Sequence, residues 1–105
     1  MENLLVEGIA AFDRKDYNKA METLKPLALA GNSEAQCLVG NMYHLGLGVD
    51  VDISEAIAWY TKSSDQGYGV ASNNLGAIYA SSPEASTKWY LNAKKQGFSH
   101  TPIKI

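Results

Sequence analysis

Very few side chains in this sequence could perform nucleophilic, acid–base or metal chemistry. Cys37 is the single cysteine, and His44 and His100 are the two histidines. A zinc site usually takes four ligands, so these three residues would have to borrow carboxylates from elsewhere in the chain. Cys37 also has no base next to it in the sequence to activate its thiol. We therefore expect His44 at a helix end or in a binding groove, and Cys37 as a small buried or groove-lining side chain.

Two short segments have part of the pattern of a ligand-binding loop. Asp50-x-Asp52 has the spacing that opens a calcium loop, but Glu55 stands where that loop needs a glycine. Gly46-x-Gly48 is no phosphate loop, because no strand precedes it and no Gly-Lys-Ser/Thr follows it. A turn and a helix cap explain these residues better. The sequence thus predicts no catalytic residue, metal ligand or cofactor, and we expect the protein not to be an enzyme.

The composition favours a small folded protein that acts away from membranes and nucleic acids. The 105 residues are 46 % hydrophobic and 19 % charged, too apolar for a disordered chain. A pI of ≈ 5.6 argues against nucleic acid as the main partner. No apolar run approaches the ~18 residues of a membrane span, and the start at Met1-Glu2-Asn3 lacks the basic region of a secretory signal. The single cysteine points to a reducing compartment, so we expect a cytoplasmic location.

Internal repeats are the strongest signal in the sequence. A shift of 36 residues aligns Ala35, Val39, Gly40 and Tyr43 with Ala71, Leu75, Gly76 and Tyr79. A shift of 30 aligns Trp59, Tyr60 and Gly67 with Trp89, Tyr90 and Gly97, and a shift of 32 aligns Gly8 with Gly40. Because the shift changes only between aligned blocks, each unit consists of two rigid elements and a loop of variable length. A single domain, 1–105, therefore divides into units at about 1–31, 32–67 and 68–97 and a tail, 98–105.

Each unit is predicted to form a hairpin of two helices. In 33–44 and 53–66 the apolar residues recur every three or four positions, as on one face of a helix. The expected caps are Asn32 or Ser33, Asp52 and Ser82 at helix starts, and Gly31, Gly67 and Gly97 after helix ends. No strand signal competes. We expect an all-α fold of about six short helices in three hairpins.

Glycine recurs inside the first helix of every unit, at Gly8, Gly40 and Gly76. Because glycine costs roughly 1 kcal/mol relative to alanine in a helix, its recurrence predicts close approach of the paired helix. The aromatic residues on the repeat are predicted to fill the core between successive units. They are Tyr43, Tyr79, Trp59, Trp89, Tyr60 and Tyr90.

The middle unit resembles a known repeat family. Its residues Ala35-x-x-Leu38-Val39-Gly40-x-x-Tyr43-x-x-Gly46-x-Gly48-Val49 and Asp52-x-x-x-Ala56-x-x-Trp59-Tyr60 are similar to the Sel1-like repeat, a relative of the tetratricopeptide repeat. The family's usual Ala-Ala pair is Ser63-Ser64 here, and the third unit has Ala80-Ser81-Ser82-Pro83 in place of the Gly-x-Gly-Val loop. The first unit is similar to the opening unit common in bacterial proteins of this family. The resemblance implies a right-handed α-solenoid that binds a protein or peptide on its concave face, as an adaptor or regulator without catalytic residues.

In such a solenoid the first helix of each hairpin lines the inner surface, so the resemblance also implies a partner-binding face. Cys37, Asn41 and His44 share one side of the 33–44 helix, and the repeat shifts carry their positions onto the other units. The candidate partner-binding residues are Leu5, Ile9, Phe12, Cys37, Asn41, His44, Asn73 and Ala77. Asparagine amides can pair with a bound backbone, and an apolar end can anchor a side chain. Alternatively, the apolar trio closes the core and the asparagines are only solvated.

We therefore expect a small protein–protein interaction module whose partner is a protein or peptide, with neither nucleic acid nor a membrane. An alternative is a dedicated inhibitor, such as an immunity protein that neutralises a toxin or an effector enzyme. A small-molecule hydrolase, with His44 and Cys37 as its candidates, is less favoured by the residues. Two further possibilities stay open: end-to-end stacking of copies, and capping of the last hairpin by Ile103 and Ile105.

Overall fold

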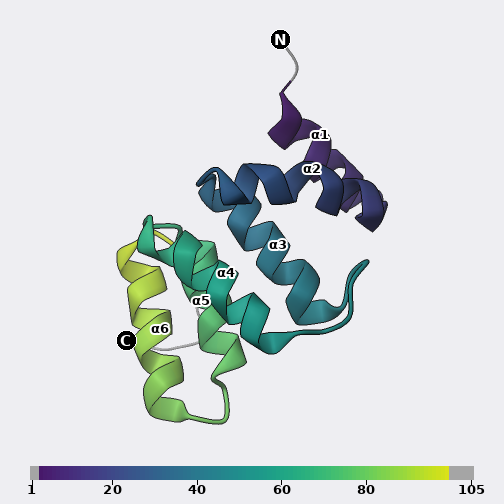
Figure 1. The fold of residues 1–105 in the computed structure, drawn as a ribbon. Helices are drawn as coiled ribbons and strands as arrows, with labels where there is room; N and C mark the ends of the chain where they lie inside the picture. The colour runs from purple at the N-terminus through teal and green to yellow at the C-terminus, as the bar shows by residue number, and fades with distance from the viewer. Residues whose placement is uncertain (1–2, 100–105) are drawn as a thin grey trace.

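The computed structural model of the protein describes residues 3–99, and this part of the chain holds six α-helices and no strand (Figure 1). The helices are α1 (Leu4–Asp13), α2 (Tyr17–Leu29), α3 (Ser33–Leu45), α4 (Ile53–Asp65), α5 (Gly69–Ile78) and α6 (Pro83–Lys95). Each helix packs against its neighbours in the chain, so that helical hairpins follow one another in a curved array of 43 × 29 × 22 Å. The predicted all-α solenoid of helical hairpins is confirmed. His100, Ile103 and Ile105 lie outside the described residues.

Side-chain caps and glycines set the ends of these helices. Asn32 and Asp52 accept a hydrogen bond from the amide three residues ahead, at 2.9 and 3.1 Å, which satisfies a donor that has no partner inside the helix. These two predicted caps are confirmed. Ser82 makes no capping bond, and α6 begins instead with Pro83, whose missing N–H suits a first helical position. The left-handed backbone after helix ends is found at Gly31, Gly67 and Gly97.

The glycines inside α3 and α5 allow each hairpin to close. A Cβ on Gly40 would lie 2.6 Å from Tyr60 Cδ1, and one on Gly76 would lie 2.5 Å from Tyr90 Cδ1. These distances are far inside van der Waals contact, so the predicted close approach of the paired helices is confirmed. The tyrosine rings occupy the space that the absent Cβ leaves. Tyr60 and Tyr90 therefore pack inside their own hairpins. Tyr60 also reaches the next unit, as the repeat pattern predicts, because it shares a buried cluster with Ala71 and Leu75 of α5.

The core between the first two hairpins is apolar. Trp59 is 7 % exposed and belongs to the same buried cluster as Ala28, Ala35, Val39 and Met42. Its indole ring therefore packs between hairpins, as predicted. A second buried cluster continues into the last hairpin and consists of Cys37, Ala56, Tyr60, Ala71 and Leu75.

Glutamine side chains join neighbouring hairpins by hydrogen bonds. Gln66 Nε2, at the end of α4, donates to Gly31 O at 2.8 Å and to Gln36 Oε1 at 2.9 Å. Gln96, which the 30-residue shift aligns with Gln66, donates through Nε2 to Ser64 O at 3.0 Å. Gln96 Oε1 also accepts from the hydroxyl of Ser72 in α5. The same residue type therefore ties each later hairpin to the one before it.

Candidate functional site

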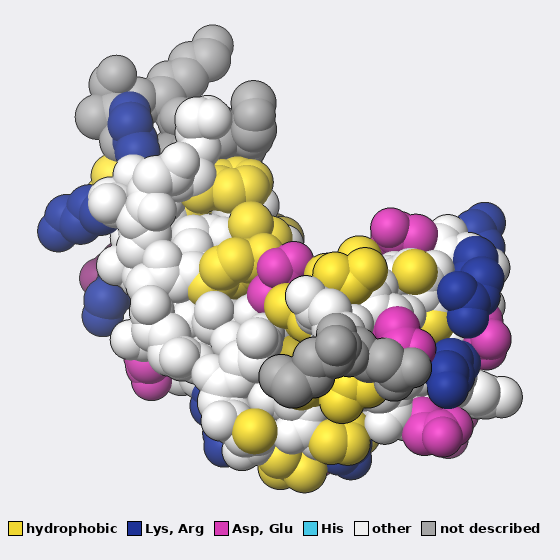
Figure 2. Space-filling model, turned by 90° about the horizontal axis from the view of Figure 1, so that it is seen from above, with side chains coloured by type: hydrophobic (Ala, Val, Ile, Leu, Met, Phe, Trp, Pro, Cys, Tyr) yellow, Lys and Arg dark blue, Asp and Glu magenta, His cyan; other side chains and the backbone are white. Residues whose placement is uncertain are grey.

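The array is hollowed on the side formed by the first helices of its hairpins, α1, α3 and α5. Figure 2 shows this hollow between the two ends of the molecule, with hydrophobic side chains on both sides of it. Sequence analysis predicts that the candidate partner-binding residues lie on this face. We give the name groove to the surface around Ile9 of α1, Asn41 of α3 and Asn74 of α5, three half-buried residues of these helices.

A chain of hydrogen bonds links α3, α4 and α5 beneath the groove. The Tyr60 hydroxyl donates to Asn41 Oδ1 at 2.6 Å, and Asn74 Nδ2 donates to the same oxygen at 3.1 Å. Asn74 Nδ2 also contacts Cys37 Sγ at 3.7 Å. His44 Nδ1 lies 3.2 Å from the Tyr60 hydroxyl oxygen. Because the hydroxyl has one proton and gives it to Asn41, His44 Nδ1 must be the donor in this contact.

This network fixes the orientation of two side-chain amides in the groove. Asn41 Oδ1 accepts two hydrogen bonds, so its Nδ2 points away from the network; Asn74 uses its Nδ2 and keeps Oδ1 free among the described residues. The buried side-chain atom that lacks a partner there is Asn73 Oδ1, so the free atoms of Asn41 and Asn74 both reach the surface. The groove therefore presents a donor and an acceptor side by side, which we call the amide pair.

Burial keeps the Cys37 thiol and the Tyr60 hydroxyl of this network uncharged. Burial raises the pKa of the Cys37 thiol to about 12, against an opposing effect of the contact from Asn74. Burial, followed by the nearby Cys37, likewise raises the pKa of the Tyr60 hydroxyl well above its usual range. Within the described residues no hydrogen bond joins Cys37 to His44. The cluster is built to hold the amide pair in place rather than to supply a thiolate.

The remaining candidate residues are placed as follows. Leu5 and Phe12 pack against the first core cluster, and the Phe12 ring meets Tyr17 edge-on with centroids 5.8 Å apart. These two side chains therefore help to close the core. Ile9 is half-buried and Ala77 of α5 is exposed, so both reach the surface.

Three predicted residues come together and two partners were missed. Cys37, Asn41 and His44 meet in one network, although Cys37 is only 2 % exposed and lies beneath the surface. Sequence analysis did not select Tyr60 or Asn74 for this site. The repeat shift aligns Asn74 with an apolar leucine, Leu38, so the repeat did not indicate Asn74 as a site residue. Only the pair of adjacent asparagines at 73–74 pointed to a polar contact there.

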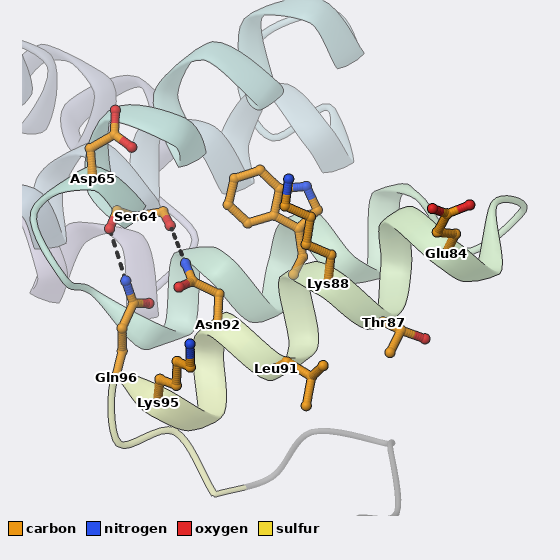
Figure 3. Close-up of a pocket in the computed structure, with 10 residues that line it drawn as sticks. Ser64, Asp65, Glu84, Thr87, Lys88, Leu91, Asn92, Lys95 and Gln96 are labelled. Carbon is orange, nitrogen blue, oxygen red and sulfur yellow. Dashed lines mark hydrogen bonds between the residues drawn. The ribbon is translucent and has the colours of Figure 1, made fainter.

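A second concavity, of about 710 Å³, lies over α6 and the end of α4 (Figure 3). One side of α6 forms most of its wall, with Leu91 in the middle and lysines on either side. Asn92 and Gln96 join this wall to Ser64 of α4 by the hydrogen bonds drawn in Figure 3. In residues 3–99, no group of three His, Cys, Asp or Glu side chains is placed to hold a metal ion. No helix in that range has the length and apolar character needed to cross a membrane.

Comparison with known proteins identifies the repeat. The Sel1 repeat model matches residues 33–68. Two sel1-like repeat-containing proteins of Acanthamoeba polyphaga mimivirus are 34 % identical over 62 residues and 38 % identical over 64 residues. These matches cover 57 % and 53 % of this chain, and 12 % and 11 % of the viral proteins.

A third relative is chitin synthase regulatory factor 3 of Schizosaccharomyces pombe. It is 34 % identical over 78 residues, which are 73 % of this chain and 8 % of the yeast protein. The chain thus spans only a small part of the length of all three relatives. Repeats of this type generally mediate protein–protein interactions. The motif of the middle unit, the stacked helical hairpins and these matches agree that residues 33–68 form a Sel1 repeat and that the chain is similar to Sel1-like repeat proteins.

Proposed function

We propose that the protein is a binding module that holds an extended segment of a partner protein in the groove. The observation that carries this proposal is the amide pair. A peptide backbone offers one carbonyl acceptor and one N–H donor at each residue, and Asn41 Nδ2 with Asn74 Oδ1 supplies the complementary groups. Every peptide repeats these backbone atoms at each residue, so the amide pair anchors an extended backbone without selecting its sequence.

The network beneath the groove supports this proposal because it prepares the amides for binding. An asparagine on a bare surface loses rotamer freedom when it binds, at a cost of about 0.5–1.5 kcal/mol for a flexible side chain. Asn41 is already held by Tyr60 and Asn74, so much of this cost is met on folding. Side-chain selection then falls to the apolar surface beside the amides, where Ile9 and Ala77 lie.

In this proposal the module acts as an adaptor or regulator, without catalysis, in the cytoplasm. The yeast relative carries the word regulatory in its name, which favours a role in controlling a partner. Neutral Cys37 and Tyr60 favour a non-catalytic site, because a thiolate nucleophile needs a lowered pKa. A lone cysteine buried without a disulfide suits a reducing compartment.

The test uses a displayed library of random peptides selected on the whole immobilised protein. Peptides that bind are synthesised and their dissociation constants measured with the wild type, Asn41→Ala and Asn74→Ala. We expect each substitution to weaken binding about tenfold, the effect of losing about one hydrogen bond. Asn92→Ala is the matched control, because it removes a hydrogen-bonded amide from α6, outside the groove.

Circular dichroism of each variant shows whether it is folded. Two outcomes contradict the proposal: selection yields no binding peptide, or the selected peptides bind folded Asn41→Ala and Asn74→Ala as tightly as the wild type. A loss of equal size in Asn92→Ala would also count against the groove, because it would point to a general effect on the array.

A further inference from the structure

The three helices that form the groove share an unusual charge composition. Neither α1, α3 nor α5 contains a lysine or an arginine, so no side of these helices can place one in the groove. The lysines and the arginine of the described residues belong to α2, α4 and α6 or to the turn before α2. In Figure 2 they gather towards the outer ends of the molecule, whereas hydrophobic and acidic side chains border the hollow. An acidic side chain on this face therefore has no lysine or arginine partner on the helices that line it.

Glu34 is an acidic residue of this kind, on the groove side of α3. It precedes Asn41 by seven residues, which is close to two full turns, so both side chains leave the same side of the helix. Glu34 is half-buried, and its place in the first turn of α3 favours a negative charge. The ion pair found among the described residues joins Arg14 to Asp16 instead. In the part of the chain that the structure describes, the groove thus holds a half-buried carboxylate without an ionic partner.

The Glu34 carboxylate lies near Tyr68 and Cys37, where α3 meets the start of α5. Burial, and next the negative charge of Glu34, raise the pKa of the Tyr68 hydroxyl. Burial is also the main cause of the raised pKa of Cys37; the contact from Asn74 opposes it, and Glu34 adds a smaller increase. Cys37 Sγ in turn lies 3.7 Å from Asn74 Nδ2. Glu34, the half-buried ring of Tyr68 and the amide pair therefore occupy one stretch of the groove.

We propose that the partner segment held in the groove carries an arginine whose guanidinium group binds the Glu34 carboxylate beside Tyr68. This inference rests on the proposed function, because the amide pair holds the backbone of the same segment. A planar guanidinium can give a carboxylate two parallel hydrogen bonds and can stack on an aromatic ring. It is also more weakly hydrated than the ammonium group of lysine, so it enters a half-buried site at a lower cost. Arginine therefore fits this place better than lysine does.

Glu34 also disfavours acidic segments. An aspartate or glutamate at the same place would bring two negative charges together, and the helices that line the groove carry no lysine or arginine to compensate them. Discrimination between partners comes from such repulsion as well as from attraction. The carboxylate therefore selects partner segments by charge, which the backbone contacts of the amide pair cannot do. The apolar surface near Ile9 and Ala77 stays available to other side chains of the segment.

The test uses the peptides selected from the random library on the whole immobilised protein, which we expect to be enriched in arginine. In a selected peptide the arginine is replaced by citrulline, which keeps the shape of the side chain and removes its positive charge. Dissociation constants of both peptides are measured with the wild type and with Glu34→Gln. We expect either change alone to weaken binding about tenfold, the effect of losing a hydrogen-bonded charge pair. The second change should then add little, because the interaction needs both partners.

Glu22→Gln is the matched control, because it makes the same change at an exposed position of α2, outside the groove. It should bind the arginine peptide like the wild type. Salt supplies a second readout, since added salt screens an ion pair. The affinity of the wild type for the arginine peptide should fall as salt rises, and that of Glu34→Gln should fall less. Circular dichroism shows whether each variant is folded.

Three results overturn this inference: selected peptides without enriched arginine, an arginine peptide that binds folded Glu34→Gln as tightly as the wild type, or an equal loss in Glu22→Gln. Binding of the citrulline peptide to the wild type needs no variant to fold, and unchanged affinity there also overturns it. If such peptides still lose affinity with Asn41→Ala and Asn74→Ala, the proposed function stands and only the arginine contact fails. If the selection yields no binding peptide, the proposed function fails and this inference fails with it.

Discussion

Replacing Tyr60 by phenylalanine removes one oxygen atom from the middle of the network beneath the groove. That oxygen donates to Asn41 Oδ1 at 2.6 Å and accepts from His44 Nδ1 at 3.2 Å. The phenyl ring keeps its place against Gly40, so the packing of α3 on α4 is unchanged. Tyr60→Phe therefore measures the hydrogen bonds of the hydroxyl separately from the burial of the ring.

The structure sets the size of the expected effect. A buried hydrogen bond contributes about 0.5–1.5 kcal/mol net, and an unpaired buried polar group costs about 1–3 kcal/mol. Tyr60 is fully buried and its bond to Asn41 is short, which favours the upper part of the first range. Asn41 Oδ1 keeps its bond from Asn74, and half-buried His44 can turn to water, so neither is left unpaired. We expect the free energy of unfolding to fall by about 1–1.5 kcal/mol.

Urea unfolding followed by circular dichroism measures this loss, with Tyr43→Phe as the matched control. The Tyr43 hydroxyl accepts a longer bond, 3.3 Å, from Lys25 at a half-buried position, so its removal should cost no more than about 0.5 kcal/mol. Peptides selected on the groove should also bind Tyr60→Phe more weakly, because Asn41 loses one of its two fixed bonds. Equal losses of stability in the two variants, or no loss in Tyr60→Phe, would refute the account of the network.

Three further predictions follow from single contacts. Gly40→Ala places a Cβ against the Tyr60 ring and should destabilise the fold by about 1–3 kcal/mol, seen as a lower Tm; an unchanged Tm would mean that α3 and α4 are not held at this contact. Asp52→Ala should cost about 1 kcal/mol in urea unfolding because it removes a helix cap, whereas Ser82→Ala should cost little because Ser82 makes no capping bond. The Cys37 thiol, whose pKa is raised from 9.0 to about 12, ionises first in the unfolded chain, so the free energy of unfolding should fall as pH rises across that window. Alkylation of native Cys37 should therefore keep accelerating up to about pH 12, and a plateau near 9 would contradict its burial.

The parts of the fold that sequence predicts best are those set by nearby residues. Asn32 and Asp52 cap helices because their side chains reach an amide only three positions ahead, a contact that needs no tertiary structure. Gly40 was predictable for a different reason. A costly residue type that returns at the same place in every unit indicates a steric demand of the fold itself. Asn41 was placed on the inner face by helical spacing together with the family resemblance.

The parts that sequence missed depend on which neighbour a face meets. Trp59 and Tyr60 are adjacent aromatic residues on one helix, and both repeat at Trp89 and Tyr90. Spacing shows that both are buried, but it does not show that Trp59 packs towards the first hairpin, whereas Tyr60 packs against Gly40 and towards the last hairpin. The recurring pairing of the glycine with the tyrosine was the available signal, because the ring needs the room that an absent Cβ provides. Asn74 was missed because its hydrogen bond joins two different hairpins, and the residue pattern within one repeat unit does not show such a contact.

Polar joints between hairpins explain how so short an array holds a defined groove. Each hairpin contacts only its neighbours, so the curvature is set at the joints. Contacts made only by alanine side chains would let one hairpin slide over the next, because hydrophobic burial is non-directional. The Ser64 hydroxyl, in place of the family's usual alanine, lies 2.6 Å from that of Ser72 and fixes α5 on α4. The amide pair spans the same two hairpins, since Asn41 lies on α3 and Asn74 on α5. The spacing of the donor and acceptor in the groove is therefore set by the bond between the two asparagines, together with the serine contact that holds α5 on α4.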